Sequence, residues 1–176
     1  MTNTQEKIRL LSRANRGRAT IPSFLASLSE ALGEPVEAGA LVALPETDFL
    51  FATFRECYRR ASKAYRRFFR PSEEGQVYRI ACCLGERLAH EEVFLLTKLS
   101  EICGAVRLSA STLLERAEPT MRFDGDSICA LSKDCDHGVL IDHNPDELEQ
   151  AYEISVWGER WESLILACDP SRSGEQ

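Results

Sequence analysis

Two long stretches of the chain repeat apolar residues at three- and four-residue steps, the spacing of one face of an α-helix. The first predicts a helix over residues 47–69, with the stripe Leu50, Phe54, Cys57, Tyr58, Ala61, Tyr65 and Phe68. The second predicts a helix over residues 74–103, with the stripe Val77, Ile80, Ala81, Leu84, Leu88, Leu95, Leu99 and Ile102. Gly85 interrupts the second stretch. Because a glycine inside a helix costs about 1 kcal/mol relative to alanine, we expect a close helix crossing or a kink there.

Shorter helical patterns flank these stretches. Residues 4–13 are weakly periodic and close at the Arg-Gly-Arg of residues 16–18. A short amphipathic helix is predicted from Pro22, which suits a first helical turn, to the residue before Gly33. Another is predicted over residues 109–117, and residues 38–46 form an apolar linker or a short strand.

From Thr120 onward the apolar period changes to two, which is typical of β-strands. Asp124-Gly125 and Gly158-Glu159 each separate two alternating segments, and both pairs suit two-residue hairpin turns. A strand over residues 138–142 lies between them, and residues 145–151 predict a one-turn helix. Together these segments predict an antiparallel meander of about five strands.

The chain therefore predicts a single α+β domain over residues 1–176, with an N-terminal helical layer packed on a C-terminal antiparallel sheet. The helical half spans residues 1–118, the β half spans residues 119–170, and residues 171–176 are expected to be a frayed tail.

The predicted turn at residues 158–159 assigns the two faces of the last hairpin. One face carries the core residues Tyr152, Ile154, Val156, Trp161 and Ile165. The other face carries Glu153, Trp157, Arg160 and Glu162 and is expected to meet solvent or a partner.

Charge changes at the same boundary. Residues 1–118 carry 17 Lys or Arg and 15 Asp or Glu, whereas residues 119–176 carry 4 and 13, and the chain has a formal net charge of −7. A negative charge of this size disfavours non-specific binding to nucleic acid or an anionic membrane and favours basic partners.

The cysteines and the first residues predict a cytoplasmic protein. The seven cysteines include no Cys-x-x-Cys pair, and most lie in apolar segments, so we expect reduced, buried thiols. Polar residues stand where a signal peptide needs an apolar core, and no stretch approaches the roughly 20 apolar residues of a spanning helix.

The carboxylates of the β half are open to two interpretations. Turns favour aspartate for backbone reasons alone, which would make them a solvated rim. Alternatively, closely packed like charges form a surface that a basic partner would neutralise. Trp157 would then be an aromatic anchor with a charged surround. The predicted partner-binding residues are Asp124, Asp126, Asp134, Asp136, Asp142, Glu153, Trp157 and Glu162.

A basic stripe follows the first long helix. Its members are Arg55, Arg59, Lys63, Arg66 and Arg70. Like charges four residues apart repel, so we expect counter-charges nearby, supplied by the acidic third of the chain. A nucleic-acid groove is the alternative for the same residues.

The remaining chemistry is weakly specified. The spacing of Cys129, Cys135, His137 and His143 matches no common zinc knuckle, and Asp134-x-Asp136-x-Gly138 lacks the later ligands of a calcium loop. We recognise no phosphate loop, metalloprotease helix or nucleophile elbow, so no catalytic residue, metal or cofactor is predicted.

The sequence thus predicts a cytoplasmic protein-binding module whose acidic surface engages a basic, toxin-like protein, as an immunity or antitoxin-type inhibitor covers a nuclease. Two other classes stay open at this point. One is a metal-dependent enzyme that uses the clustered aspartates, and the other is a nucleic-acid-associated factor that uses residues 55–70.

Overall fold

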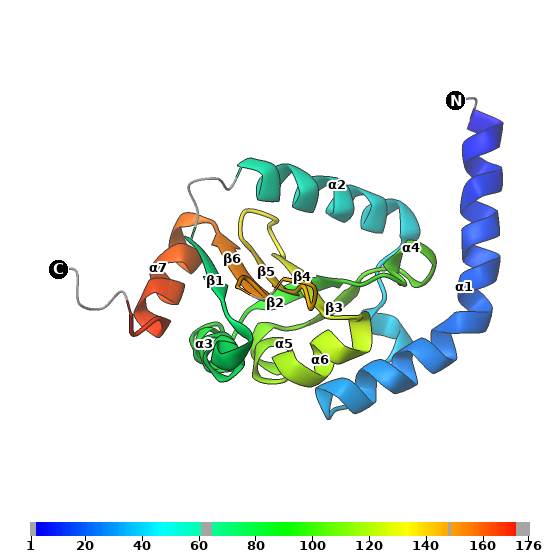
Figure 1. Cartoon of the computed structure of the whole chain (residues 1–176). Helices are drawn as coiled ribbons and strands as arrows, with labels where there is room; N and C mark the ends of the chain where they lie inside the picture. The colour runs from blue at the N-terminus through cyan, green and yellow to red at the C-terminus, as the bar shows by residue number, and fades with distance from the viewer. Residues whose placement is uncertain (1–2, 61–64, 148, 172–176) are drawn as a thin grey trace.

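The computed structural model describes residues 3–60, 65–147 and 149–171, which form one antiparallel sheet with helices on both faces (Figure 1). The strand order is β1-β6-β5-β4-β2-β3. The strands are β1 (Tyr65–Phe69), β2 (Glu92–Leu96), β3 (Val106–Ser109), β4 (Ser127–Ser132), β5 (Gly138–His143) and β6 (Tyr152–Trp157). The helices are α1 (Asn3–Leu32), η1 (Ala38–Ala40), α2 (Leu44–Arg60), η3 (Pro71–Glu73), α3 (Glu74–Arg87), α4 (Ser100–Cys103), α5 (Ala110–Glu115), α6 (Ala117–Asp124) and α7 (Glu159–Cys168). The α+β class is confirmed, with six strands where about five were predicted.

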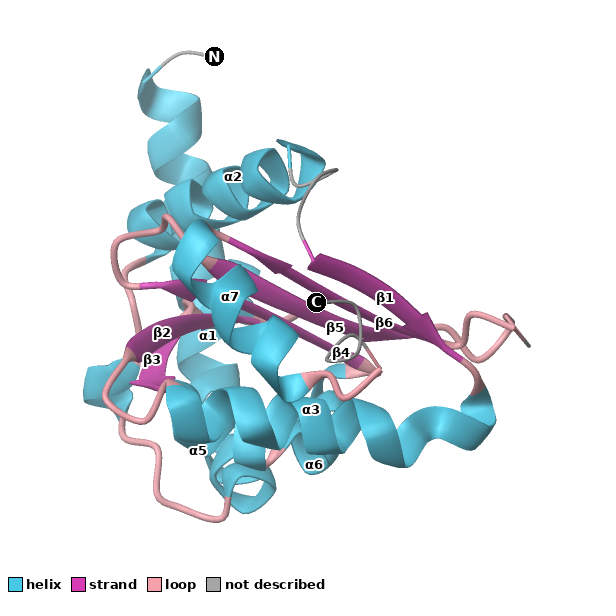
Figure 2. Cartoon of the chain, turned by 90° about the vertical axis from the view of Figure 1, so that its left-hand side faces the viewer, coloured by secondary structure: helices cyan, strands magenta, loops and turns pink. Residues whose placement is uncertain are grey.

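The sheet separates two apolar clusters. Helix α2 covers one face, where Leu50 packs with Phe94, Leu131 and Trp157. Helices α3, α5 and α6 cover the opposite face and enclose the larger cluster, while α7 packs against α3 and the β1–β6 side of the sheet (Figures 1 and 2). Because both faces are covered, the prediction that one face of β6 meets solvent is wrong along most of its length.

Both long predicted helices end early and are followed by strands. Helix α2 ends at Arg60, and residues 65–69 form edge strand β1, while residues 61–64 lie outside the described part. Helix α3 ends at Arg87, and residues 92–96 form β2. The run Val93–Leu96 is buried on both faces of the sheet, and an apolar run of this kind has no period that separates strand from helix. Strands β1 to β3 also precede residue 118, so the expected boundary there does not separate helices from strands.

Two glycines that were predicted to lie in hairpin turns cap helices instead. Residues 117–124 are helix α6, and Gly125 ends it with a left-handed φ of 72°. Gly158, with φ 92°, precedes helix α7, so residues 159–165 do not form a strand. A positive-φ glycine suits either a turn or a helix end, which explains the error. The described residues of 145–151 contain no helix, whereas the strand at 138–142 and the helix at 109–117 are confirmed.

The expectation about Gly85 is also confirmed. A Cβ at this position would lie 3.0 Å from the Cβ of Leu114 and 3.4 Å from the carbonyl oxygen of Ser111. Helix α3 therefore crosses α5 at close range, and the glycine is what permits the approach.

The two short N-terminal helices are one helix. Helix α1 continues through Arg-Gly-Arg, carries Pro22 in its interior and bends along its length (Figure 1). Proline removes one helical hydrogen bond and bends a helix without ending it when both sides are held by packing. Phe24, Leu28 and Leu32 after the bend are buried in the main core.

Candidate binding site at the acidic end of the sheet

The carboxylates predicted to share one face lie at opposite ends of β5. Asp134 and Asp136 are exposed in the turn before β5, whereas Asp142 is the next-to-last residue of β5 and pairs with Glu153 of β6. The part of β5 from Gly138 to Asp142 separates these groups by roughly 13 Å at the usual rise per strand residue. The prediction of a single acidic face is therefore wrong, and each end must be considered separately.

One end of the sheet, which we call the acidic end, holds a small cavity. Asp142, Glu153 and Phe68 occupy adjacent strands in register, so their side chains share one face of the sheet. The loop after β5 closes the other side. The cavity has a volume of about 90 Å³ and is lined by Phe68, Asp142, Asn144, Glu147, Gln150, Ala151 and Glu153. Small-molecule sites are usually several hundred Å³, so this volume suits a single side chain.

The carboxylates of the acidic end are only partly neutralised. Glu153 accepts a hydrogen bond from Arg66 at 2.9 Å and another from the Tyr58 hydroxyl at 3.2 Å. For Asp142, burial and then the nearby charge of Glu153 raise the pKa above its ordinary value. A cation entering the cavity would offset both effects, because a nearby positive charge favours the ionised carboxylate.

The predicted basic stripe is divided between two elements. Arg55 and Arg59 are exposed on α2, Arg66 and Arg70 belong to β1 and the residue after it, and Lys63 lies outside the described residues. The ion pair of Arg66 with Glu153 confirms, for this one arginine, the expectation of counter-charges from the acidic third. Arg66 also lies 5.0 Å from the ring centroid of Phe68, which places a cation–π contact beside the cavity.

One further predicted partner-binding residue lies near this end. Asp126 has a φ of 80° and is half-exposed, with a carboxylate oxygen 3.9 Å from Nδ1 of His143. The His143 ring stacks on Tyr152 at 4.3 Å between centroids. Asp126 therefore adds charge at the rim of the acidic end.

Asp124 is buried and serves the fold. Its carboxylate accepts a hydrogen bond from the backbone N–H of Lys98 at 2.9 Å, and its residue is 8 % exposed. Burial raises the pKa of Asp124 to about 6. Because it is buried, Asp124 is not part of a binding surface, contrary to the prediction.

This pKa predicts an unusual pH dependence. Because the folded pKa lies above the value of about 3.9 in an unfolded chain, ionisation of Asp124 lowers stability as pH rises from about 4 to about 6. Asp124→Asn keeps an acceptor for Lys98 and should raise the free energy of unfolding at pH 7 by on the order of 1 to 3 kcal/mol, with no gain at pH 4. Urea denaturation at several pH values measures this. Asp126→Asn, with the same charge change, is the control, and an equal gain from both variants would contradict the assignment.

Trp157 is buried, contrary to its predicted exposure. It is 5 % exposed, its ring lies 5.2 Å from that of Phe54 and 6.4 Å from that of Tyr58, and both partners come from α2. Its indole also fills the space where a Cβ of Gly138 would stand. The sequence of a strand does not show whether a given face is buried or exposed when the helix that covers that face is distant in the chain. Glu162, predicted beside it, instead lies on α7.

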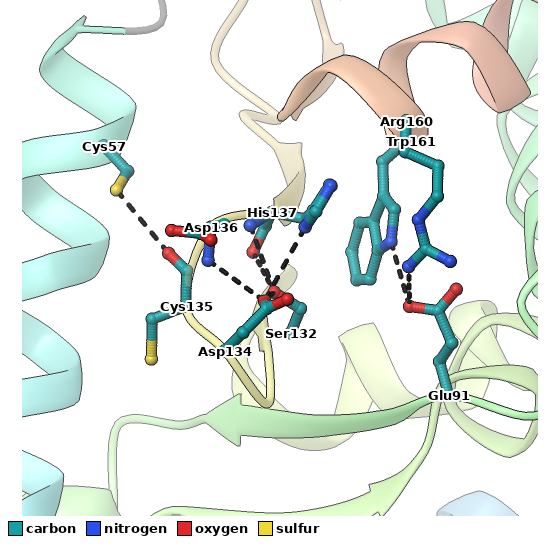
Figure 3. A network of polar contacts seen from close by, with 9 residues as sticks. All are labelled: Cys57, Glu91, Ser132, Asp134, Cys135, Asp136, His137, Arg160 and Trp161. Carbon is teal, nitrogen blue, oxygen red and sulfur yellow. Dashed lines mark hydrogen bonds and ion pairs between the residues drawn. The ribbon is translucent and has the colours of Figure 1, made fainter.

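The other end of β5 is a turn held by hydrogen bonds among its own residues and by one from the Cys57 thiol of α2 to the carbonyl oxygen of Cys135 (Figure 3). Asp134 accepts hydrogen bonds from the Ser132 hydroxyl and from the backbone N–H of Asp136, and the Ser132 bond is the main cause that lowers the pKa of Asp134. The backbone N–H of His137 donates to the Ser132 hydroxyl at 3.0 Å. Asp134 thus stabilises its own turn, while Asp136 is exposed.

The four candidate zinc ligands are dispersed. Cys129 lies in β4, Cys135 and His137 lie in the turn, and His143 lies at the far end of β5. Within the described ranges, no group of three or more His, Cys, Asp or Glu residues is arranged to hold a metal ion. Burial raises the pKa of Cys129 to about 12, so this thiol is protonated at neutral pH.

Some residues that the sequence analysis did not select make specific contacts in the structure. Glu91 accepts hydrogen bonds from Arg160 at 2.6 Å and from the Trp161 indole at 3.1 Å, and joins the start of β2 to α7 (Figure 3). Trp161 is fully buried, as predicted. Phe68, Asn144 and Glu147 of the acidic end were also missed, because their grouping depends on how β1 and the loop after β5 approach each other.

The expectation that all cysteines are reduced is wrong for one pair. Cys83 of α3 and Cys168 of α7 form a disulfide, with their Cα atoms 5.7 Å apart. Residues 85 positions apart in the chain meet here because α7 packs on α3. Cys57, Cys82, Cys103, Cys129 and Cys135 are free thiols.

Comparisons with protein-family models, curated proteins and solved structures found no significant match to this chain. Among the residues described, no helix is long and apolar enough to cross a membrane. The fold and the cavity define an α+β protein with a small acidic site of side-chain size.

Proposed function

We propose that this chain is a protein-binding module whose acidic end accepts a cationic side chain from a basic protein. The observation that carries the proposal is the cavity of about 90 Å³ in which Asp142, Glu147 and Glu153 converge beside the half-exposed ring of Phe68. An arginine or lysine of the partner supplies the missing charge, while its methylene groups pack on the ring. A pocket lined by an aromatic ring and carboxylates is suited to hold the anchor residue of an interface.

The concrete form of this proposal is a cytoplasmic immunity or antitoxin-type inhibitor. A nuclease uses a cationic surface to bind phosphate, and carboxylates placed on that surface exclude nucleic acid. Disulfides are rare in the cytoplasm, so the oxidation state of Cys83 and Cys168 in cells tests the assigned compartment. The Arg66–Glu153 pair supports protein binding over nucleic-acid binding, because it occupies one of the arginines that phosphate would need.

The proposal is tested by exchanging charge at one end of the sheet at a time. Glu147→Lys should weaken binding of a deca-arginine peptide by more than tenfold, because it places a cation in the rim of the cavity. Asp136→Lys makes the same charge change at the other end, at an exposed side chain, and should have only the small effect of net charge. Isothermal titration calorimetry at moderate salt measures both. In lysate, a stoichiometric basic protein should be retained by Asp136→Lys and lost by Glu147→Lys, with or without nuclease treatment.

Equal weakening by the two variants would contradict a specific site and leave only general attraction to a negative chain. Recovery that disappears on nuclease treatment would favour the exposed Arg55 and Arg59 of α2 as phosphate contacts.

A further inference from the structure

The first part of α1 projects away from the sheet (Figures 1 and 2). We call residues 4–19 the arm. Only Arg13 and Gly17 are buried within it, and most of its other residues are exposed. An isolated helix of this length is marginally stable in water, so the contacts that hold the arm are informative.

Two contacts fix the arm rigidly to the body. Arg13 donates two hydrogen bonds to the Asp48 carboxylate, at 2.7 and 2.8 Å, and a third from Nε to the carbonyl oxygen of Glu101 at 2.6 Å. At Gly17 the backbone approaches so closely that a Cβ would stand 2.1 Å from the carbonyl oxygen of Ile102. The arm is therefore held in one direction by α2 and α4.

The arm carries two apolar side chains that are mostly exposed to solvent. Ile8 is 62 % exposed and Leu11 is 64 % exposed, and their three-residue spacing places them on one side of the helix. The arm also contains five Lys or Arg residues and one Glu. Arg13 is buried against Asp48 and Arg9 lies 3.7 Å from the same carboxylate, so the cations left over are Lys7, Arg16 and Arg18. An apolar pair inside a cationic surround has the composition of an interface, not of a solvated helix.

The acidic end has the complementary composition. Phe68 is 41 % exposed there and is surrounded by carboxylates, among them Asp142 and Glu147. The arm cannot reach this site within its own molecule. It is anchored beside α4, which leads into β3, and β3 and β1 are the two opposite edges of the six-stranded sheet, roughly 24 Å apart.

We propose that the arm of one molecule docks on the acidic end of a second copy of this chain, with Ile8 and Leu11 on Phe68 and the basic residues on the carboxylates. The inference rests on the acidic end of the proposed function and assigns to it a regulatory occupant, because a docked arm covers the site that the basic partner needs. The two surfaces differ, so the contact is head-to-tail.

Head-to-tail docking allows a complementation experiment. The arm variant combines Ile8→Glu with Leu11→Glu, and the acidic-end variant combines Phe68→Ser with Glu147→Lys. All four positions are at least partly exposed, and circular dichroism verifies the folds. Sedimentation velocity at about 20 mM salt should show self-association of the wild type that disappears at about 500 mM. Each variant alone should be monomeric, and an equimolar mixture should form a 1:1 dimer, because one intact arm then meets one intact acidic end.

The control is Leu166→Ser, which removes a similarly exposed apolar residue of α7 and should leave association unchanged. A wild type that stays monomeric at low salt, or a mixture that stays monomeric while the wild type associates, overturns the inference. The arm variant separates this outcome from failure of the proposed function. If the arm variant binds deca-arginine at least tenfold more tightly than the acidic-end variant does, the acidic end is a cation site whether or not the arm docks. If the arm variant and the wild type bind the peptide no better than the acidic-end variant, the proposed function fails.

Discussion

Trp157→Ala is expected to lower the free energy of unfolding by about 3–5 kcal/mol, the usual cost of deleting a buried tryptophan. The indole is 5 % exposed and is the centre of the contact between α2 and the sheet, with Phe54 and Tyr58 packed on it. Its removal leaves a cavity above Gly138, which has no side chain to fill it. Urea denaturation followed by circular dichroism measures the loss.

Trp157→Phe is the matched control. The Trp157 indole N–H is buried and has no hydrogen-bond partner among the described residues, so phenylalanine strands no polar group and should cost clearly less than alanine. The sequence had predicted an interface role for this residue. If Trp157→Ala unfolds at the same urea concentration as the wild type and binds the basic partner less tightly, that earlier interpretation is correct and the packing argument is wrong.

Asp169→Ala should be comparably destabilising, by about 3–5 kcal/mol, because it removes the fully buried carboxylate that pairs with the partly buried Arg67. Asp169 is fully buried after α7 and accepts hydrogen bonds from Arg67 and, at 2.9 Å, from the Tyr65 hydroxyl. The group therefore ties the end of α7 to edge strand β1. Thermal and urea denaturation at pH 7 measure the effect.

The pH dependence of Asp169 provides a second readout. Burial alone would raise its pKa, but the hydrogen bonds from Ser171 and Tyr65 and the charge of Arg67 outweigh it, so the pKa lies below its ordinary value. The stabilisation is present above the unfolded pKa of about 3.9 and is lost as the pH falls below it. The double variant Asp169→Leu with Arg67→Met removes both charges and should recover much of the loss. A double variant as unstable as Asp169→Ala would show that the ion pair is not the cause.

Local patterns correctly predicted the elements in which the periodic apolar residues are the ones that the fold buries. The stripe from Val77 to Leu88 is amphipathic, and it is buried as expected in α3. The strand at residues 138–142 and the burial of Trp161 were predicted for the same reason. The prediction failed at β2, because a short apolar run buried on two sides satisfies a helix pattern as well as a strand pattern. It failed at β1, because the buried residues Tyr65 and Phe69 are four positions apart, a spacing that places them on one face of a helix or of a strand.

The candidate site was predicted in part. Charge counting identified Asp142 and Glu153, and repulsion along the basic stripe led to the correct expectation of an acidic partner for Arg66. It also grouped Asp134 and Asp136 with them, because sequence proximity does not reveal that β5 separates its two ends. Glu147 belongs to the same group of carboxylates but was not chosen as a site residue, and Phe68 had no local signal for a site, since its significance depends on which strand lies next to β6.

By itself, the sequence determined the class of the fold, the excess of carboxylates after residue 118 and the close crossing at Gly85, because these depend on local composition and spacing. Only the tertiary structure decided which carboxylates meet in a cavity, that α2 covers Trp157, and that the arm of α1 projects with Ile8 and Leu11 exposed. The physical reason is that strand order and helix docking join residues far apart in the chain, and burial on a given face depends on the element that covers it.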